Sequence, residues 1–399
     1  MKMLVTYVLG DCPGCRRENC FGNVDVGRNG VLRGCRHCRY SRHVYLPPVQ
    51  KKVIYLDQFF FSSAFRGGDE RFVRAANRIA ELAEDQLIVA PYSSIHEDET
   101  HQWPAYAELL EFIKKASRGA EFEAAYEVER KQIYRAFSNW RNDGAVEQAL
   151  EREDALDTEH VFEWDGYVWI DVGQYHGDPV LIAEAKQQSV ERLIDEVFPN
   201  WRQSQATLAQ DVVAECNAAA RALWASYLRL VQRLAHGDMD APLDAPIMSQ
   251  YMQGCMCSMP EEMSPEERVQ QCVSFLMSEH FRSVPTQWLT SHMWATLKAQ
   301  VKAGSYQRRD RTLNRLSGVY FDIKHISTYA PYVDAFIMDK PMAELVSRPE
   351  VNLAARYNTR VFSLNNWDEL IEWFDELQAG MSDEHREGLL DAYPYRRNR

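Results

Sequence analysis

Residues 331–342 read PYVDAFIMDKPM, and the apolar run AFIM at 335–338 lies between two carboxylates, Asp334 and Asp339. Four consecutive apolar residues are typical of a strand that is buried on both faces. A carboxylate beside such a strand is costly to bury unless it has a partner. The stretch therefore predicts a second group, from another part of the chain or from solution, that meets these acids.

Three further segments have the same character as AFIM. They are VIYL at 53–56, LIVA at 87–90 and RVFSL at 360–364. Between them, segments such as 69–85 and 365–377 carry apolar residues at helical spacing. This alternation predicts an α/β fold built on a parallel sheet.

A long helical segment interrupts that alternation between residues 104 and 310, where several stretches show helical periodicity. A short β element is expected at 161–172, around an Asp-Gly turn. A connection of this length is too long for a bare loop, so a large helical insertion lobe is expected. The predicted domains are 1–45, a cysteine-rich module; 53–103, the first part of the α/β core; 104–310, the insertion; and 311–399, the second part of the core.

The N-terminal module carries two Cys-x-x-Cys pairs, Cys12/Cys15 and Cys35/Cys38. Each pair can direct two thiolates at one tetrahedral ion, and the arrangement resembles a zinc ribbon. A module of about 40 residues buries too little apolar surface to fold alone, so structural Zn²⁺ would supply the folding energy. Cys20 is left as a spare cysteine.

The formal net charge of −13 is unevenly distributed, because residues 1–52 hold ten Lys and Arg against three Asp and Glu. Arg16 and Arg17 lie in this basic module, and Arg308, Arg309 and Arg311 form a second basic stretch. Both stretches favour contact with phosphate groups. Docking of a protein on the ribbon and a solvated connector at 305–315 remain as alternatives.

Acids follow the predicted strands. Asp57 ends VIYL, Asp339 ends AFIM, and Glu97, Glu99 and Asp322 stand near predicted helix starts. The carboxyl ends of parallel strands meet at one edge of a sheet, so these side chains are expected to converge there. Crowded carboxylates repel one another, and a hard cation such as Mg²⁺ or Mn²⁺ relieves that repulsion. The alternative is that each Asp simply caps the helix that follows it.

The stretches VIYLDQFFFSSA (53–64), VAPYSSIHEDET (89–100) and FDIKHISTYAPYVDAFIMDKPMAELV (321–346) resemble the core motifs of PIN-like nuclease domains. Those domains are metal-dependent ribonucleases, so the resemblance implies a parallel sheet with helices on both faces. The resemblance maps their acidic tetrad onto Asp57, Glu99, Asp322 and Asp339. It makes Asp334 a further acidic position, and Glu97 competes with Glu99 for the second place. His96 and His325, near helix starts, are expected to be satisfied polar groups.

The sequence therefore predicts a metal-dependent endoribonuclease with a Mg²⁺ or Mn²⁺ site, of the kind found among toxins and antiviral effectors. RNA is the expected partner, with DNA and tRNA as open alternatives, and the ribbon or the helical lobe is expected to serve a protein partner. The alternative function is a non-catalytic scaffold for nucleic acid or protein. The chain has no run of 18 apolar residues, so no membrane association and a cytoplasmic location are expected.

Overall fold

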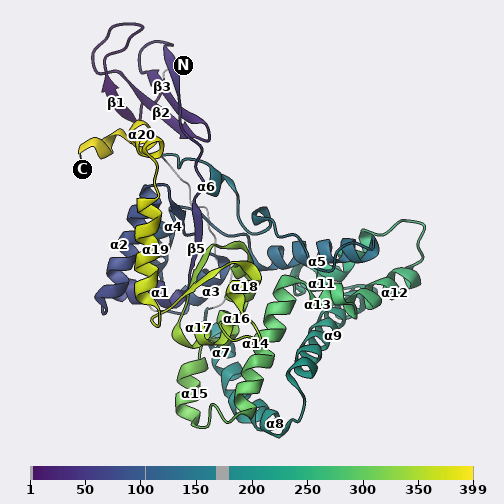
Figure 1. The fold of residues 1–399 in the computed structure, drawn as a ribbon. Helices are drawn as coiled ribbons and strands as arrows, with labels where there is room; N and C mark the ends of the chain where they lie inside the picture. Colours follow the sequence, from purple (N-terminus) through teal and green to yellow (C-terminus); the bar gives the residue numbers. More distant parts are fainter. Residues whose placement is uncertain (1–2, 104, 168–178, 399) are drawn as a thin grey trace.

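The computed structural model describes residues 3–103, 105–167 and 179–398 (Figure 1). Three regions are visible: an N-terminal tip of β-strands, a central α/β body and a helical lobe that extends sideways from the body. In the part of the chain that the structure describes, none of the helices has the length and apolar character needed to cross a membrane.

The N-terminal tip is an antiparallel four-stranded sheet in the order β1-β2-β3-β4. The strands are β1 (Tyr7–Gly10), β2 (Phe21–Gly27), β3 (Gly30–Cys35) and β4 (Ser41–Tyr45). The two Cys-x-x-Cys pairs lie at one end of this sheet, after β1 and at the end of β3. The tip therefore corresponds to the predicted cysteine-rich module.

The body contains a parallel sheet in the order β6-β5-β7-β8. The strands are β5 (Lys52–Leu56), β6 (Ile88–Val89), β7 (Ala335–Ile337) and β8 (Arg360–Phe362). In the register of the central pair, Ile54 lies opposite Ala335 and Leu56 opposite Ile337. The paired residues of β5 and β7 are 281 residues apart in sequence, as Ile54 and Ala335 show, so β7 returns beside β5 after the insertion.

Helices cover both faces of this sheet, as the sequence predicts. Ile54 and Leu56 face a core with one group of helices, and Val53 and Tyr55 face the other. The first group is α1 (Gln58–Arg66), α2 (Glu70–Glu84), α4 (Tyr106–Ser117) and α19 (Trp367–Ala379). The second is α3 (Ser94–Thr100), α5 (Ala125–Arg141), α7 (Pro179–Arg192), α14 (Pro285–Lys302), α16 (Val319–Tyr329) and α17 (Lys340–Val346).

The helical insertion divides between two cores. The lobe has its own core, in which Phe137, Leu223, Phe275 and Phe281 are buried. This core joins the second half of α5 to α9 (Leu208–Ala235), α11 (Ser249–Cys257), α12 (Pro265–Leu276) and α13 (Glu279–Arg282). In contrast, α14 buries Met293 and neighbouring residues against the sheet. Part of the predicted insertion is therefore an integral layer of the α/β body.

The remaining elements are short or peripheral. They are α6 (Glu159–Phe162), α8 (Phe198–Gln203), α10 (Ala241–Asp244), α15 (Arg309–Leu316), α18 (Leu353–Tyr357) and α20 (Asp383–Ala392), with the 3-10 turns η1 (Arg152–Asp154), η3 (Ala330–Tyr332) and η4 (Pro394–Asn398) and the π-turn η2 (Leu193–Val197).

The β element expected at 161–172 is not observed within 161–167, and residues 168–172 lie outside the described residues. Helix α6 ends at Phe162, and the indole of Trp164 is buried with its Nε1 donating to the carbonyl of Pro47 at 2.9 Å. Trp164 and Tyr167 pack at the junction between tip and body instead of pairing in a strand.

The tip is fixed to the body through that junction. Val31 and Leu46 share a core with Trp164, Leu389 and Tyr393. Two polar contacts add to it: Asn23 Nδ2 donates to Tyr167 Oη at 2.8 Å, and Arg33 pairs with Asp391 at 2.9 Å. The basic residue Arg33 of the module thus has a structural partner.

Candidate metal centres

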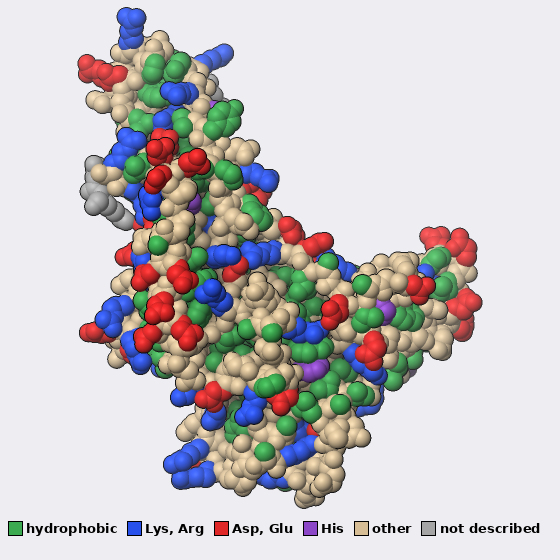
Figure 2. All heavy atoms as spheres, viewed as in Figure 1, with side chains coloured by type: hydrophobic (Ala, Val, Ile, Leu, Met, Phe, Trp, Pro, Cys, Tyr) green, Lys and Arg blue, Asp and Glu red, His purple; other side chains and the backbone are tan. Residues whose placement is uncertain are grey.

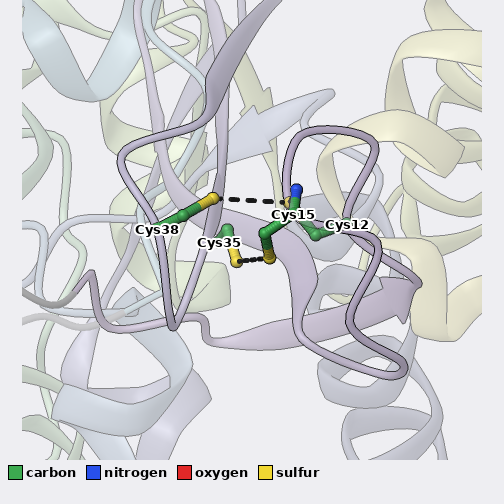
Figure 3. A group of neighbouring side chains, drawn as sticks. All are labelled: Cys12, Cys15, Cys35 and Cys38. Atoms are coloured by element: carbon green, nitrogen blue, oxygen red, sulfur yellow. Dashed lines mark hydrogen bonds between the residues drawn. The ribbon is translucent and has the colours of Figure 1, made fainter.

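The four cysteines Cys12, Cys15, Cys35 and Cys38 converge, with all Sγ atoms within 4.8 Å of one another (Figure 3). The Cys12–Cys38 and Cys15–Cys35 sulfur pairs are 3.6 and 3.8 Å apart. Thiolates that share a tetrahedral zinc ion stand about 3.8 Å apart, given Zn–S bonds of about 2.3 Å. The sulfur geometry therefore fits a structural zinc ion.

The backbone around the cysteines also favours thiolates. The N–H groups of Gly14 and Cys15 donate to Cys12 Sγ at 3.3 and 3.4 Å, and the N–H of His37 donates to Cys35 Sγ at 3.3 Å. Burial opposes ionisation of Cys35, yet the N–H groups of His37 and Cys38 lower its pKa to about 6. A thiolate is the form that binds metal.

Cys20 lies beside this group, 3.5 Å from Cys35 Sγ, but has a different environment. Its Sγ is placed to donate to the carbonyl of Arg17 at 3.2 Å. Burial, together with the neighbouring thiol of Cys35, raises the pKa of Cys20 to about 11. Although the N–H of Tyr40 opposes the change, burial and the neighbouring sulfurs raise the pKa of Cys38 to about 12 as well. Position therefore separates Cys20 from the four candidate ligands, since it lies at the border of the group whose sulfurs all converge.

A second convergence occurs at the carboxyl edge of the parallel sheet. Asp57 follows β5 directly and caps α1, with Oδ1 accepting from the N–H of Gln58 at 2.7 Å. Asp339 follows β7 and caps α17, with Oδ1 accepting from the N–H of Met342 at 2.9 Å. Each Asp therefore caps the helix that follows it, as the alternative interpretation of the sequence predicts. Each keeps its second carboxylate oxygen for another partner.

Glu99 and His325 complete a compact group with Asp57. One ligand atom from each of the three lies within 4.8 Å of the others, and all three side chains are buried. His325 Nε2 stands 3.2 Å from Glu99 Oε2, across the interface between α3 and α16. Both ring nitrogens of His325 have partners, as expected of a satisfied polar group, and its Nε2 also stands among the atoms that could hold a metal ion.

Asp322 belongs to the same electrostatic environment. It lies one turn inside α16, which begins at Val319. Burial and the charges of Asp57, Glu99 and Asp339 raise its pKa well above the usual range. Burial likewise raises the pKa of Asp57 to about 7, with Glu99 and Asp339 adding to the rise and His325 opposing it. Asp57 and Asp322 therefore feel the charges of Glu99 and Asp339. Among the described residues, however, the ligand atoms that converge within 4.8 Å are those of Asp57, Glu99 and His325, and Asp322 and Asp339 lie outside that set.

Cations from the protein offset only part of this charge. Lys186 of α7 donates to Glu99 Oε1 at 2.8 Å. Although burial disfavours the charged form, His325 and Lys186 lower the pKa of Glu99 to about 2. Beside Asp57, the buried Oε1 of Gln58 has no hydrogen-bond partner among the described residues. The two carboxylates of Asp57 and Glu99 and the imidazole of His325 form a donor set that suits a divalent cation.

A chain of buried hydrogen bonds holds the two histidines. His325 Nδ1 bonds with Tyr55 Oη, which lies 2.9 Å from Ser93 Oγ. His96 Nδ1 accepts from the N–H of Ser93, so its Nε2 carries the proton and donates to the carbonyl of Leu56 at 2.8 Å. Burial lowers the pKa of His96 to about 3. His96 is thus a neutral positioning group, as predicted, while Tyr55 orients the ring of His325.

Two acids named from the sequence lie elsewhere. Glu97 is on α3 but pairs with Lys114 of α4 at 3.3 Å. Asp334 precedes β7, so it is at the opposite end of the strand from Asp339. There it accepts from Lys52 at 3.0 Å and from Arg152 at 2.8 Å. Glu99 is therefore the acid of α3 that joins Asp57 and His325. Asp334 instead forms ion pairs at the amino edge of the sheet.

The predicted basic residues fall into three environments. Arg16 and Arg17 are exposed on the tip. Arg309 is exposed and pairs with Asp195 at 2.8 Å, while Arg308 and Arg311 line a cavity beside α15. Figure 2 shows Lys and Arg side chains projecting from the end of the body where α15 lies, and acidic side chains at the far tip of the helical lobe.

Comparison with known proteins adds no relative: no family model matches the chain, no curated protein matches it, and no solved structure matches it. The functional argument therefore depends on the residues and their geometry.

Proposed function

We propose that the chain is a PIN-like, metal-dependent endoribonuclease whose active site is the acidic group at the carboxyl edge of the sheet. The observation that carries the proposal is the convergence of Asp57, Glu99 and His325, which are buried and whose ligand atoms lie within 4.8 Å of one another. Buried acids that repel one another destabilise a fold, and a bound divalent cation is the ordinary reason for assembling them.

The residues have separable roles in this proposal. Asp57, Glu99 and His325 would hold the cation, and Asp322 and Asp339 would supply further carboxylate oxygens at its edge. When bound, Mg²⁺ or Mn²⁺ polarises a phosphate oxygen and makes a water molecule more acidic. Tyr55 accepts the Nδ1 proton of His325 when the Nε2 lone pair is directed at a cation, which fixes the ring. An imidazole in the donor set favours Mn²⁺ over Mg²⁺.

The test compares two neighbouring acids of α3. Glu99→Gln and Glu97→Gln remove one carboxylate each, from residues that differ in where they point. Incubation of a single-stranded RNA with 1 mM Mn²⁺ is expected to show cleavage by the wild type and by Glu97→Gln. Glu99→Gln is expected to lose at least about 100-fold in rate, because it removes a carboxylate that would hold the cation.

Equal rates for the wild type and Glu99→Gln would exclude this active site. Absence of cleavage in every protein, with RNA still bound, would favour the scaffold instead. Asp57→Asn serves as a second active-site variant, since asparagine also caps a helix and the fold is retained.

A further inference from the structure

A cavity of about 360 Å³ lies beside the proposed active site, between the loop that follows α14, helix α15 and the beginning of α17. Its lining is unusually basic for an acidic protein. Four arginines line it, Arg308, Arg311, Arg315 and Arg348, with Glu344 as the lining acid. The volume is in the range of ligand-binding cavities, which begin at about 300 Å³.

Most of this positive charge is unpaired. Arg315 pairs with Glu344 at 2.7 Å. Among the described residues, Arg308, Arg311 and Arg348 have no acidic side chain within ion-pair distance. Adjacent Arg309 differs, because it turns away from the cavity and pairs with Asp195. Three free guanidinium groups around one cavity suit a ligand that carries more than one negative charge.

Two observations connect the cavity to the acids. Pro341, two residues after Asp339, is part of its lining. Arg315, which also lines it, pairs with Glu344 of α17, the helix that Asp339 caps. A ligand in the cavity would therefore lie beside the end of α17 that carries Asp339.

Tyr306 adds an aromatic surface to the same cavity. Arg315 lies over its ring, 5.7 Å from the centroid. Tyr306 has a φ of 63°, which is uncommon for residues other than glycine and asparagine. Arg202 Nη2 donates a hydrogen bond to its backbone carbonyl at 3.0 Å. An aromatic ring and guanidinium planes together offer stacking for a nucleobase beside the sites for its phosphate.

We propose that this arginine cavity binds a nucleotide through a terminal phosphate, supplied by a phosphorylated RNA end or by a free mononucleotide. A terminal phosphate carries close to two negative charges at neutral pH, whereas an internal phosphodiester carries one. The excess of free arginines thus matches the monoester. The inference rests on the proposed nuclease function, to which it adds recognition of the substrate end.

The experiment measures binding without added Mn²⁺ or Mg²⁺, so that it does not depend on cleavage and the tip keeps its zinc. Fluorescence anisotropy compares one labelled hexanucleotide RNA with a 5′-phosphate, with a 3′-phosphate and with hydroxyl ends. At least one phosphorylated form is expected to bind about tenfold more tightly than the hydroxyl form. Arg311→Ala and Arg348→Ala are each expected to remove most of that preference, since each deletes a charge-assisted contact.

Arg309→Ala is the matched control, because it removes an exposed arginine of the same helix that has its own partner. It is expected to retain the preference. Competition with AMP identifies the source: displacement at equal concentration indicates a free nucleotide, and preference for the oligonucleotide indicates an RNA end. Equal binding of all three RNAs, or equal losses in Arg309→Ala and Arg311→Ala, would overturn the inference. Preserved binding without any Mn²⁺-dependent cleavage would instead remove the nuclease proposal alone.

Discussion

The two candidate metal centres are assembled in opposite ways. Cys12 and Cys38 are 26 residues apart, and tight turns bring their sulfurs together. Glu99 and His325 are 226 residues apart and meet only because α3 and α16 pack on the same sheet. The first centre stabilises a small module that has little hydrophobic core of its own. The second places buried carboxylates inside a large hydrophobic core, where their charge is unfavourable. Removing metal should therefore unfold one region and merely strain the other.

The largest expected effect is loss of the tip. Cys35 is fully buried and is one of the four converging sulfurs, so Cys35→Ser should abolish binding of zinc, an interaction of roughly 10 kcal/mol in small zinc modules. Amide protons of β2 and β3 should then exchange quickly, while those of β5 and β7 remain protected. Mass spectrometry of bound zinc and hydrogen exchange measure both. Cys20→Ala, the matched control, should keep its zinc; loss of zinc from it would contradict the assignment of the four ligands.

The acidic centre should respond in the opposite direction. Burial raises the pKa of Asp57 from 3.8 to about 7, so the metal-free folded state holds a proton that the unfolded state has lost. Stability should therefore fall as the pH rises from about 4 to about 7. Asp57→Asn removes this penalty and should stabilise the metal-free protein at pH 8 by up to about 4 kcal/mol. Glu99 affects stability at lower pH. Because its pKa is lowered in the folded state, the stabilisation that ionised Glu99 provides is lost as the pH falls from 4.5 towards 2.

Urea titrations of the metal-free wild type and Asp57→Asn at pH 4 and pH 8 measure this effect. The two proteins should have similar midpoints at pH 4. If Asp57→Asn is less stable than the wild type at pH 8, the carboxylate of Asp57 is stable in its buried position without a cation. That result would contradict the proposed difference between the two centres.

A smaller effect should distinguish a cation supplied by the protein from one supplied by solution. Lys186→Met leaves the buried Glu99 with one partner fewer and should destabilise the metal-free protein by about 2 kcal/mol. Mn²⁺ should restore most of that stability, because it binds the folded state alone. Lys114→Met, which breaks the pair with Glu97, is the control and should gain no more from Mn²⁺ than the wild type does. Equal gains in the two variants would contradict the site.

The same contrast explains what the sequence could predict. The Cys-x-x-Cys spacing specifies the four sulfurs, because the ligands are local. Asp57 and Asp339 were predictable because each directly follows an apolar strand, and their strands are parallel neighbours. Asp334 lies five residues before Asp339, at the other end of β7, so strand direction alone separates it from the acidic group.

The other members depend on packing that spacing does not encode. His325 follows Asp322 by three residues on α16, yet only the docking of that helix shows that both approach the acids. Lys186 comes from α7, inside the insertion, and no pattern in the sequence connects it to Glu99. The insertion itself was expected to form a separate lobe, but its amphipathic helices cannot reveal which of them, such as α14, covers the sheet.

Anomalous diffraction from a crystal grown with Mn²⁺ tests the central claim most directly. The account predicts a manganese peak about 2.1 Å from one oxygen each of Asp57 and Glu99, with His325 Nε2 turned towards it. A zinc peak among the four cysteines in the same crystal would serve as the internal standard. Zinc at the cysteines with no manganese between Asp57 and Glu99 would contradict the account, and the acids would then be helix caps and ion-pair partners only.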